Sequence, residues 1–353
     1  MNMSAILTPR AIAAQYTEVA SNRIPFLGEG LFPAAKKLGL DLSEIKGYKG
    51  LNVPLKPANF DAKAPLRGRL GFAKIDRQMA FFREAMLVSE RDQQEIMRVQ
   101  DMNDPYAMEV LRRVFDDVNT LVDAANIVPE RMRMQLLFPA EGRPGIALVS
   151  DGVSYYYDYD PNGEYVENNC VNAAKQWSDS TAAPLTDIAA LQDHIEGNTG
   201  TRPVYALMNR ATFNLMKDTE QVRKAILAQN VTANIFMSEG VVREALKKTN
   251  GIVPIVYDKV YKDEDGSTQK LVPDGMVSLL PEGALGKTWY GTTPEERGVP
   301  GTQIVHTGVA ISVVNHVNPV NTETIVSEIV LPTFERMSET GLLYVAGNGV
   351  GDS

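Results

Sequence analysis

The stretch 66–89, "LRGRLGFAKIDRQMAFFREAMLVS", decides how the rest of the sequence is interpreted. It carries five Lys or Arg residues against two acidic ones, although the whole chain has a formal net charge of −9. It also holds large apolar side chains: Leu70, Phe72, Ile75, Met79, Phe81, Phe82, Met86 and Leu87. Prolines 54, 57 and 65 just upstream forbid a helix. We therefore expect an extended excursion with its tip near residues 58–65, returning along 66–89.

A ribbon of two strands has too little core to be stable alone, so its apolar and cationic side chains need a neighbour. Our hypothesis is that an acidic surface of another copy of the chain covers residues 66–89. Residues 1–46 are broken by several Pro and Gly residues and follow neither a helical nor a strand period, so we expect an arm that also lies along something else. Head-to-tail contacts of this kind close rings and can tile a shell.

Composition narrows the class of protein. A length of 353 residues suggests two domains, or one domain with long appendages. The net negative charge argues against a sequence-independent nucleic-acid binder. A single cysteine, Cys170, excludes an internal disulfide framework. The first residues lack the pattern of a signal peptide, and no run of about 18 apolar residues predicts a membrane span, so a soluble protein of the cell interior is expected.

One long helix is predicted in the first half of the chain. Apolar residues recur at spacings of three and four from Leu111 to Ala125, and Asn103 or Asp104 can cap a helix that has Pro105 in its first turn. A run to Phe138 would approach about 50 Å, which suits a spine. Pro129 either kinks this helix or starts another.

The remaining chain predicts a mixed α+β domain. We expect strands within 145–166, a helix at 185–200 capped by Thr186, a strand at 203–209 followed by a helix at 210–229, and a helix at 241–251. Residues 252–283 predict a hairpin with Asp265-Gly266 at its turn, and residues 307–335 predict long β-rich segments.

Candidate metal sites are weak. "DYDPNG", Asp158–Gly163, fits the first half of a calcium loop, but the twelfth position is Asn169 instead of Glu, and a hairpin turn is the favoured interpretation. Asp263, Glu264 and Asp265 cluster at a hairpin tip, where turn chemistry explains them. We therefore predict no metal site.

Catalytic signatures are also missing from the sequence. His194, His306 and His316 form no ligand or catalytic motif, and Cys170 lies in a polar turn as a free thiol. No nucleophile elbow, phosphate loop or dinucleotide fingerprint is present. We predict no catalytic residues, no cofactor-binding residues and no cofactor.

The order of segments resembles the major capsid proteins of lambda-type tailed phages, the major capsid protein E family. Three stretches carry the resemblance: "PVYALMNRATFNLM" at 203–216, "VPIVYDKVYKDEDGSTQKLVPDGMVSLLPEGALGKTWYG" at 253–291, and "LPTFERMSETGLLYVAG" at 331–347. The resemblance implies the HK ninety-seven fold, shared by tailed-phage coats, encapsulins and the herpesvirus shell floor. It assigns an N-terminal arm (1–46), an extended loop overlapping a neighbour (47–89), a peripheral domain with the spine helix (90–149), an axial domain (150–310), and return strands of the peripheral domain with the C-terminus (311–353).

The resemblance also implies a function. Such subunits are not enzymes; they self-assemble as hexamers and pentamers into the icosahedral head that encloses the double-stranded DNA of a tailed phage. The implied partners are further copies, a separate scaffolding protein, a portal, DNA contacted non-specifically and no membrane, with a decoration protein left open. Assembly would take place in the host cytoplasm and the product would be the virion capsid. Lys63 or Lys74 would be the loop's candidate cross-link donors, without local support. The alternatives are an encapsulin-like nanocompartment shell and an oligomeric α/β enzyme.

Overall fold

The structure is a computed structural model that describes residues 8–10, 13, 26–47, 72–91, 93–94, 105–150, 153–229, 238–263 and 265–346. The described chain forms two compact units. The first comprises residues up to Leu42, Arg77–Arg133 and Gly286–Thr333, and the second comprises Ser43–Asp76, Met134–Leu285 and the residues from Phe334 onward. Each unit therefore combines segments that are far apart in the sequence.

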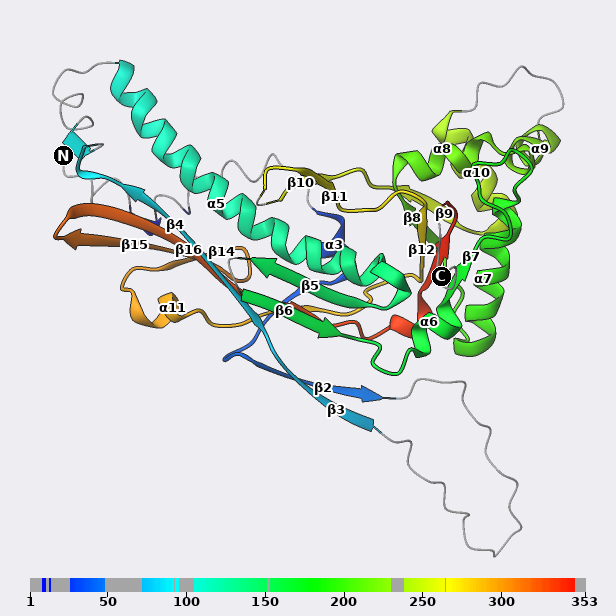
Figure 1. The fold of residues 1–353 in the computed structure, drawn as a ribbon, viewed down its shortest axis with the longest axis horizontal. Helices are drawn as coiled ribbons and strands as arrows, with labels where there is room; N and C mark the ends of the chain where they lie inside the picture. Colours follow the sequence, from blue (N-terminus) through cyan, green and yellow to red (C-terminus); the bar gives the residue numbers. More distant parts are fainter. Residues whose placement is uncertain are drawn as a thin grey trace, which may run out of the picture. The chain divides into compact units, whose positions relative to one another are not determined.

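A six-stranded sheet organises the first unit (Figure 1). Its longest strand, β16 (Val320–Pro332), pairs antiparallel with β15 (Val309–Val317), which in turn pairs with β14 (Gln303–Val305). The far end of β16 pairs with β13 (Thr288–Tyr290), to which β1 (Ala34–Lys36) adds in parallel. The long β-rich segments predicted near the C-terminus are confirmed as β15 and β16.

The sixth strand comes from the opening stretch of sequence. Strand β4 (Ala80–Val88) pairs with β16 along its whole length, from Val88 opposite Thr322 to Ala80 opposite Val330. Met79, Ala80 and Val88 are buried, and Phe81 and Phe82 are half-buried. The hypothesis that this stretch depends on another copy for a partner is therefore wrong for the strand pairing of residues 80–88, which β16 of the same chain provides, although Leu87 remains exposed. Residues 66–71 lie outside the described residues.

The charge of this stretch is balanced within the chain as well. Helix α11 (Pro294–Gly298) presents two adjacent glutamates to the sheet. Arg83 of β4 lies 3.3 Å from Glu295, whose other oxygen accepts a 2.8 Å hydrogen bond from Ser327 of β16. Glu296 accepts from Lys36 of β1 at 2.7 Å and closes a capping box with Thr293. One short helix thus neutralises a cation on each of two strands.

The predicted spine is a single helix, α5 (Pro105–Leu137), with Pro129 inside it (Figure 1). Within the first unit its apolar stripe packs on one face of the sheet, where Leu121 and Val122 meet Val309, Ile311 and Val326. The period of three and four predicted this stripe because such residues share one helix face. The expected capping residues, 103 and 104, lie outside the described residues.

Strands β2 (Asp41–Gly47) and β3 (Phe72–Gln78) form a separate ribbon (Figure 1). They pair with each other and, among the described residues, with no other strand. The backbone N–H of Met79 donates to the carbonyl of Leu40 at 2.9 Å, which fixes the base of the ribbon. The expected extended excursion is thus present, but it is shorter than predicted because β4 belongs to the sheet.

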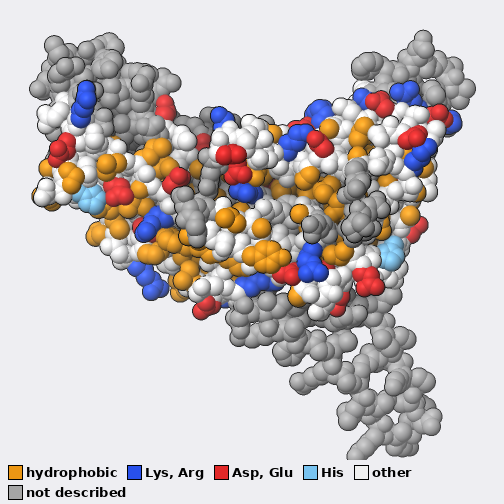
Figure 2. Space-filling view, in the orientation of Figure 1, with side chains coloured by type: hydrophobic (Ala, Val, Ile, Leu, Met, Phe, Trp, Pro, Cys, Tyr) orange, Lys and Arg blue, Asp and Glu red, His pale blue; other side chains and the backbone are white. Residues whose placement is uncertain are grey.

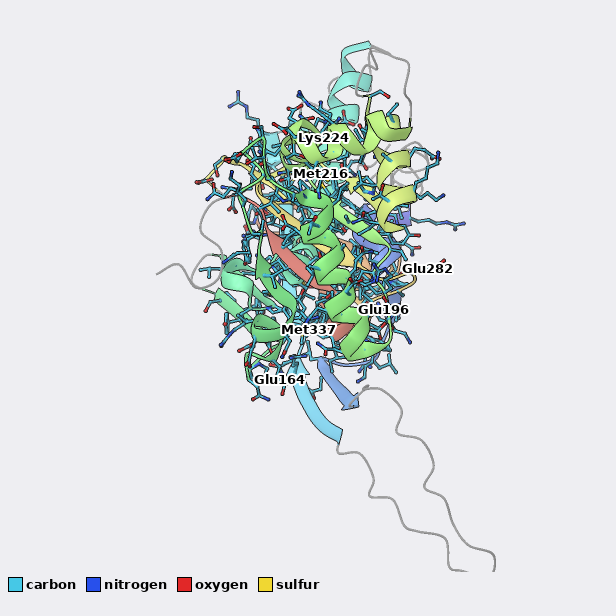
Figure 3. All side chains as sticks on the ribbon, turned by 90° about the vertical axis from the view of Figure 1, so that its right-hand side faces the viewer. Glu164, Glu196, Met216, Lys224, Glu282 and Met337 are labelled. Carbon is cyan, nitrogen blue, oxygen red and sulfur yellow. The ribbon has the colours of Figure 1, made fainter. Side chains whose placement is uncertain are left out.

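The second unit is built on a five-stranded sheet in the order β7 (Cys170–Asn172), β17 (Gly341–Tyr344), β12 (Met276–Leu280), β8 (Tyr205–Met208) and β9 (Val253–Val256). Its helices are α6 (Glu164–Asn169), α7 (Pro184–Thr199), α8 (Arg210–Asp218), α9 (Glu220–Gln229) and α10 (Glu239–Asn250). Ile188, Met216 and Leu246 are buried in one core with Leu279 and Leu343 of the sheet. Figure 3 shows this unit, with Glu196 and Lys224 marking exposed positions on α7 and α9.

Two hairpins also belong to this unit. Strands β5 (Gly145–Ser150) and β6 (Val153–Asp158) pair as predicted. So do β10 (Val260–Lys262) and β11 (Thr268–Lys270), with Gly266 at φ 80° in the predicted turn. The outer parts of 252–283 do not pair with each other, because β8 lies between β9 and β12.

Two helix boundaries differ from the sequence prediction. Helix α7 begins at Pro184 and not after Thr186, because Pro suits the first helical position and Gln221 accepts the hydrogen bond of the Leu185 N–H. The predicted helix at 210–229 is two helices: Thr219 is extended, which lets the N–H of Glu220 donate to the carbonyl of Ser180 at 2.7 Å. Tertiary hydrogen bonds override local propensity at both places.

A substitution at Gly308 tests how closely the sheet of the first unit is packed. A Cβ at this position would lie 2.2 Å from Cδ1 and 2.5 Å from Cβ of Tyr290, so the clash is with the root of a side chain that cannot swing away. We predict that Gly308→Ala lowers the free energy of unfolding by about 1–3 kcal/mol. Gly298→Ala is the matched control, since nothing lies within 4 Å of its added Cβ. Equal urea midpoints for the two variants would contradict this packing.

Candidate functional site

The predicted turn at Asp158–Gly163 is a helix start. The Asp160 carboxylate is buried and accepts from the N–H groups of Tyr165 and Val166 at 2.9 and 3.2 Å, so it caps α6. Gly163 has a φ of 73°, a conformation that favours glycine. These carboxylate oxygens serve the backbone. Within the described ranges, no three His, Cys, Asp or Glu side chains gather as a metal site.

The histidines and the cysteine occupy separate structural positions. His194 lies 3.1 Å from Asn198 on the exposed face of α7, and His316 lies 2.9 Å from Glu323 on the sheet of the first unit. His306 is exposed, with a φ of 51°. The Cys170 thiol donates to the carbonyl of Gly142, and burial, with a smaller effect of Asp160, raises its pKa to about 12. A thiol in this state is a poor nucleophile at neutral pH.

Charge on the surface is mixed. Over the face drawn in Figure 2, the described Lys and Arg side chains are scattered among Asp and Glu. Much of this charge is paired within helices, as in Lys224–Glu220 and Lys248–Glu244. None of the described helices is both long and apolar enough to cross a bilayer. Such a surface suits neither strong DNA binding nor tight membrane contact on the face shown.

The best-defined polar site is a socket in the first unit that receives the N-terminal segment Phe26–Lys36. This segment forms α3 (Leu27–Leu31) and then β1, which runs parallel to β13. The N–H of Gly28 donates to both oxygens of Glu130 on α5, at 3.0 and 3.1 Å. Thr288 of β13 donates its hydroxyl to the carbonyl of Phe32 at 2.9 Å. Phe32 itself is fully buried.

Arg133 is the cation of the socket. Its side chain is 1% exposed; Nη1 donates to Glu130 at 3.2 Å and Nε donates to the Thr288 hydroxyl at 2.9 Å. A buried pair of this kind is stable only when its remaining groups are hydrogen-bonded, as they are here. Gly28 is required because a Cβ there would lie 2.3 Å from Glu130 Oε2. The segment therefore fits the socket by both charge and shape.

A second acid faces the same guanidinium. Glu328 of β16 is 1% exposed, and neither carboxylate oxygen has a hydrogen-bond partner. Burial raises its pKa well above the usual range, and Arg133 only partly offsets this. Burial, together with the charge of Glu328, also raises the pKa of Tyr290 on β13. The socket thus contains one guanidinium, the paired Glu130 and an unpaired acid.

The sequence interpretation missed this socket. Gly28 was read as a helix breaker in an arm, although its role depends on Glu130, a hundred residues later in the chain. One signal was available for Glu328: it lies five residues from Glu323 in a strand, so the two side chains must point to opposite faces. Glu323 is on the outer face with His316, which leaves Glu328 facing the core.

The profile of the family described as phage major capsid protein E matches residues 9–338, nearly the whole chain. The chain belongs to this family. It is therefore a phage capsid subunit, as the resemblance of the three quoted stretches predicted, and its place is in the virion. A search of curated proteins finds no match.

Solved structures agree on the fold of this phage major capsid protein E member. A candidate capsid protein of a prophage in Escherichia coli CFT073 is 14% identical, with a TM-score of 0.61 over 96% of this chain and 99% of that one. A phage-related protein of Bordetella bronchiseptica RB50 is also 14% identical, with a TM-score of 0.54 over 95% and 97% of the two chains. At these identities the likeness concerns the fold alone. The predicted HK ninety-seven class is confirmed.

The fit of Gly28 gives a direct prediction. Gly28→Ala places a methyl group against Glu130 and Arg133, so we expect the free energy of unfolding to fall by about 1–3 kcal/mol. Gly30→Ala lies in the same short helix with nothing within 4 Å of the added Cβ, so it should be neutral or stabilising by up to about 1 kcal/mol. Urea unfolding of the full chain measures both. If Gly28→Ala is as stable as Gly30→Ala, the segment does not occupy the socket.

Proposed function

We propose that this capsid subunit builds an icosahedral shell from hexamers and pentamers that encloses double-stranded DNA. Membership of a major capsid family supports assembly of the chain with copies of itself. Hexamers and pentamers made from one chain supply the curvature that a closed shell requires. The shell is held by many contacts of moderate size, each offset in part by association entropy.

The β2–β3 ribbon supports an intersubunit contact. A two-stranded ribbon without a further sheet partner is marginal in water, and β2 and β3 pair with no other described strand. Its sequence continues into residues 48–71, which complete the expected extended loop and lie outside the described residues. Since β4 is already covered by β16, we assign the overlap with a neighbouring copy to residues 41–78 alone. Lys63 lies outside the described residues, as does the side chain of Lys74, so cross-linking has no support from geometry.

The inner surface would meet DNA weakly. The chain has 35 Lys and Arg against 44 Asp and Glu, so neutralising many phosphates is not its role. Non-specific, weak contact lets packaged DNA slide. We further propose a separate scaffolding protein and a portal as partners, and no catalytic activity. The first and second units would serve as peripheral and axial domains respectively.

Shortening the ribbon tests this function. Replacing residues 48–71 by a short Asn-Gly turn removes the proposed overlap while leaving the β4–β16 pairing intact. We expect a subunit with unchanged thermal unfolding that forms no closed shells by negative-stain electron microscopy. Asp265→Asn, in the exposed turn of the β10–β11 hairpin, is the control and should assemble normally. Normal shells from the shortened variant would refute the overlap.

The proposal that the shell encloses DNA is tested by analysing what the particles contain. Particles produced during infection should contain nuclease-resistant double-stranded DNA, and their hexamers and pentamers should be visible by cryo-electron microscopy. Shells that contain protein cargo without DNA would support the encapsulin-like alternative instead. A small discrete oligomer that never closes into a shell would contradict both.

A further inference from the structure

Glu328 stands out because the fold does not use it as a partner. Buried carboxylates are normally paired or accept several hydrogen bonds, since an unpaired buried charge is costly. Ser327 beside it bonds Glu295, and Glu323 on the same strand bonds His316. Glu328 is 1% exposed, yet both its oxygens lack a hydrogen-bond partner. An acid in this position is expected to be uncharged.

The charged and titratable groups of the socket other than Glu328 come from three elements. Helix α5 contributes Arg133 and Glu130, β13 contributes Tyr290, and α3 contributes Glu29, whose charge also acts on Tyr290. Arg133 is the cation that acts on Glu328. On β4, the residue opposite Glu328 is the apolar Phe82. One guanidinium therefore faces two buried acids, and Glu130 holds it.

The docked N-terminal segment bonds both of the groups that accept hydrogen bonds from Arg133. When Phe26–Lys36 is docked, the Gly28 N–H anchors Glu130, and the carbonyl of Phe32 anchors Thr288. Both anchored groups accept hydrogen bonds from Arg133, Glu130 from Nη1 and Thr288 from Nε, whereas Glu328 accepts none. Release of the segment would remove two hydrogen bonds from Glu130 and open the socket to water, so that Arg133 would be able to pair with an ionised Glu328. Docking and the ionisation of Glu328 thus oppose each other.

We propose that docking of the segment Phe26–Lys36 is coupled to a proton on Glu328, so that the socket is a proton-dependent latch for the N-terminal part of the capsid subunit. The docked state holds Glu328 neutral, and its deprotonation favours release of the segment. The latch lies within one subunit, so it holds whether or not the proposed shell architecture is correct.

The sign of the pH dependence follows from linkage. Burial in the docked state raises the pKa of Glu328, while release would return it toward the ordinary value of 4.5. Docking therefore takes up a proton at pH values between the two. Its stability is fully present below the ordinary pKa and is lost as the pH rises toward the raised one. A single proton gives at most a tenfold loss per pH unit.

Hydrogen exchange of the full chain tests the latch. The reporting amides are Phe32, Lys37 and Thr288, which donate to the carbonyls of Gly28, Tyr290 and Pro33. We expect their protection, corrected for intrinsic exchange, to fall by at least tenfold between pH 5 and pH 9 in the wild type. In Glu328→Gln, whose side chain cannot ionise, the same change should be less than about threefold. Unassembled subunits are used at every pH, with sedimentation velocity to verify their state.

Two further variants serve as a control and as a second test of Glu328. Glu84→Gln removes an exposed acid from β4 and should reproduce the wild-type pH profile. Glu328→Met keeps the volume but removes both oxygens, so it should behave like Glu328→Gln even if the amide packs poorly. A wild-type profile that stays flat, or variants at Glu328 that lose protection as steeply as the wild type, would overturn the proposal.

Discussion

The pairing of β4 with β16 is the constraint on which the rest of the first unit depends. It joins residues 80–88 to residues 322–330 in a nine-position ladder. Because β15 and β13 occupy the other side of β16, this strand lies at the centre of the sheet and is buried over most of its length. The cost of closing so long a loop grows only slowly with its length, so burial and hydrogen bonds can outweigh it.

This pairing limits what the subunit can offer to other copies. The backbone of residues 80–88 is paired within the chain by β16, and Arg83 pairs with Glu295. The N-terminal segment is likewise held by Glu130 and Thr288, both of which Arg133 bonds. The ribbon of β2 and β3, by contrast, pairs with no other strand among the described residues, which is why we propose it as the contact with a neighbour.

Local signals in the sequence predicted local structure well. The three-and-four spacing from Leu111 predicted α5, and the Asp265-Gly266 turn predicted the β10–β11 hairpin. The pairing of distant strands could not be predicted from the sequence. Nothing in residues 80–88 identifies β16 as their partner, and nothing near residue 254 shows that β8 separates β9 from β12. The socket was missed for the same reason, since Gly28, Glu130 and Thr288 come from three distant segments. Strand parity at Glu323 and Glu328 was the one readable sign of it.

Hydrogen exchange of the β4 amides in unassembled, full-length subunits tests the central claim most directly. If β4 is a strand of its own subunit's sheet, the amides of residues 80–88 that pair with β16 exchange as slowly as their partners, and shell formation leaves them unchanged. Exchange of β4 at the rate of an unfolded chain, with protection acquired only in assembled shells, would contradict the account and return this stretch to the neighbouring copy.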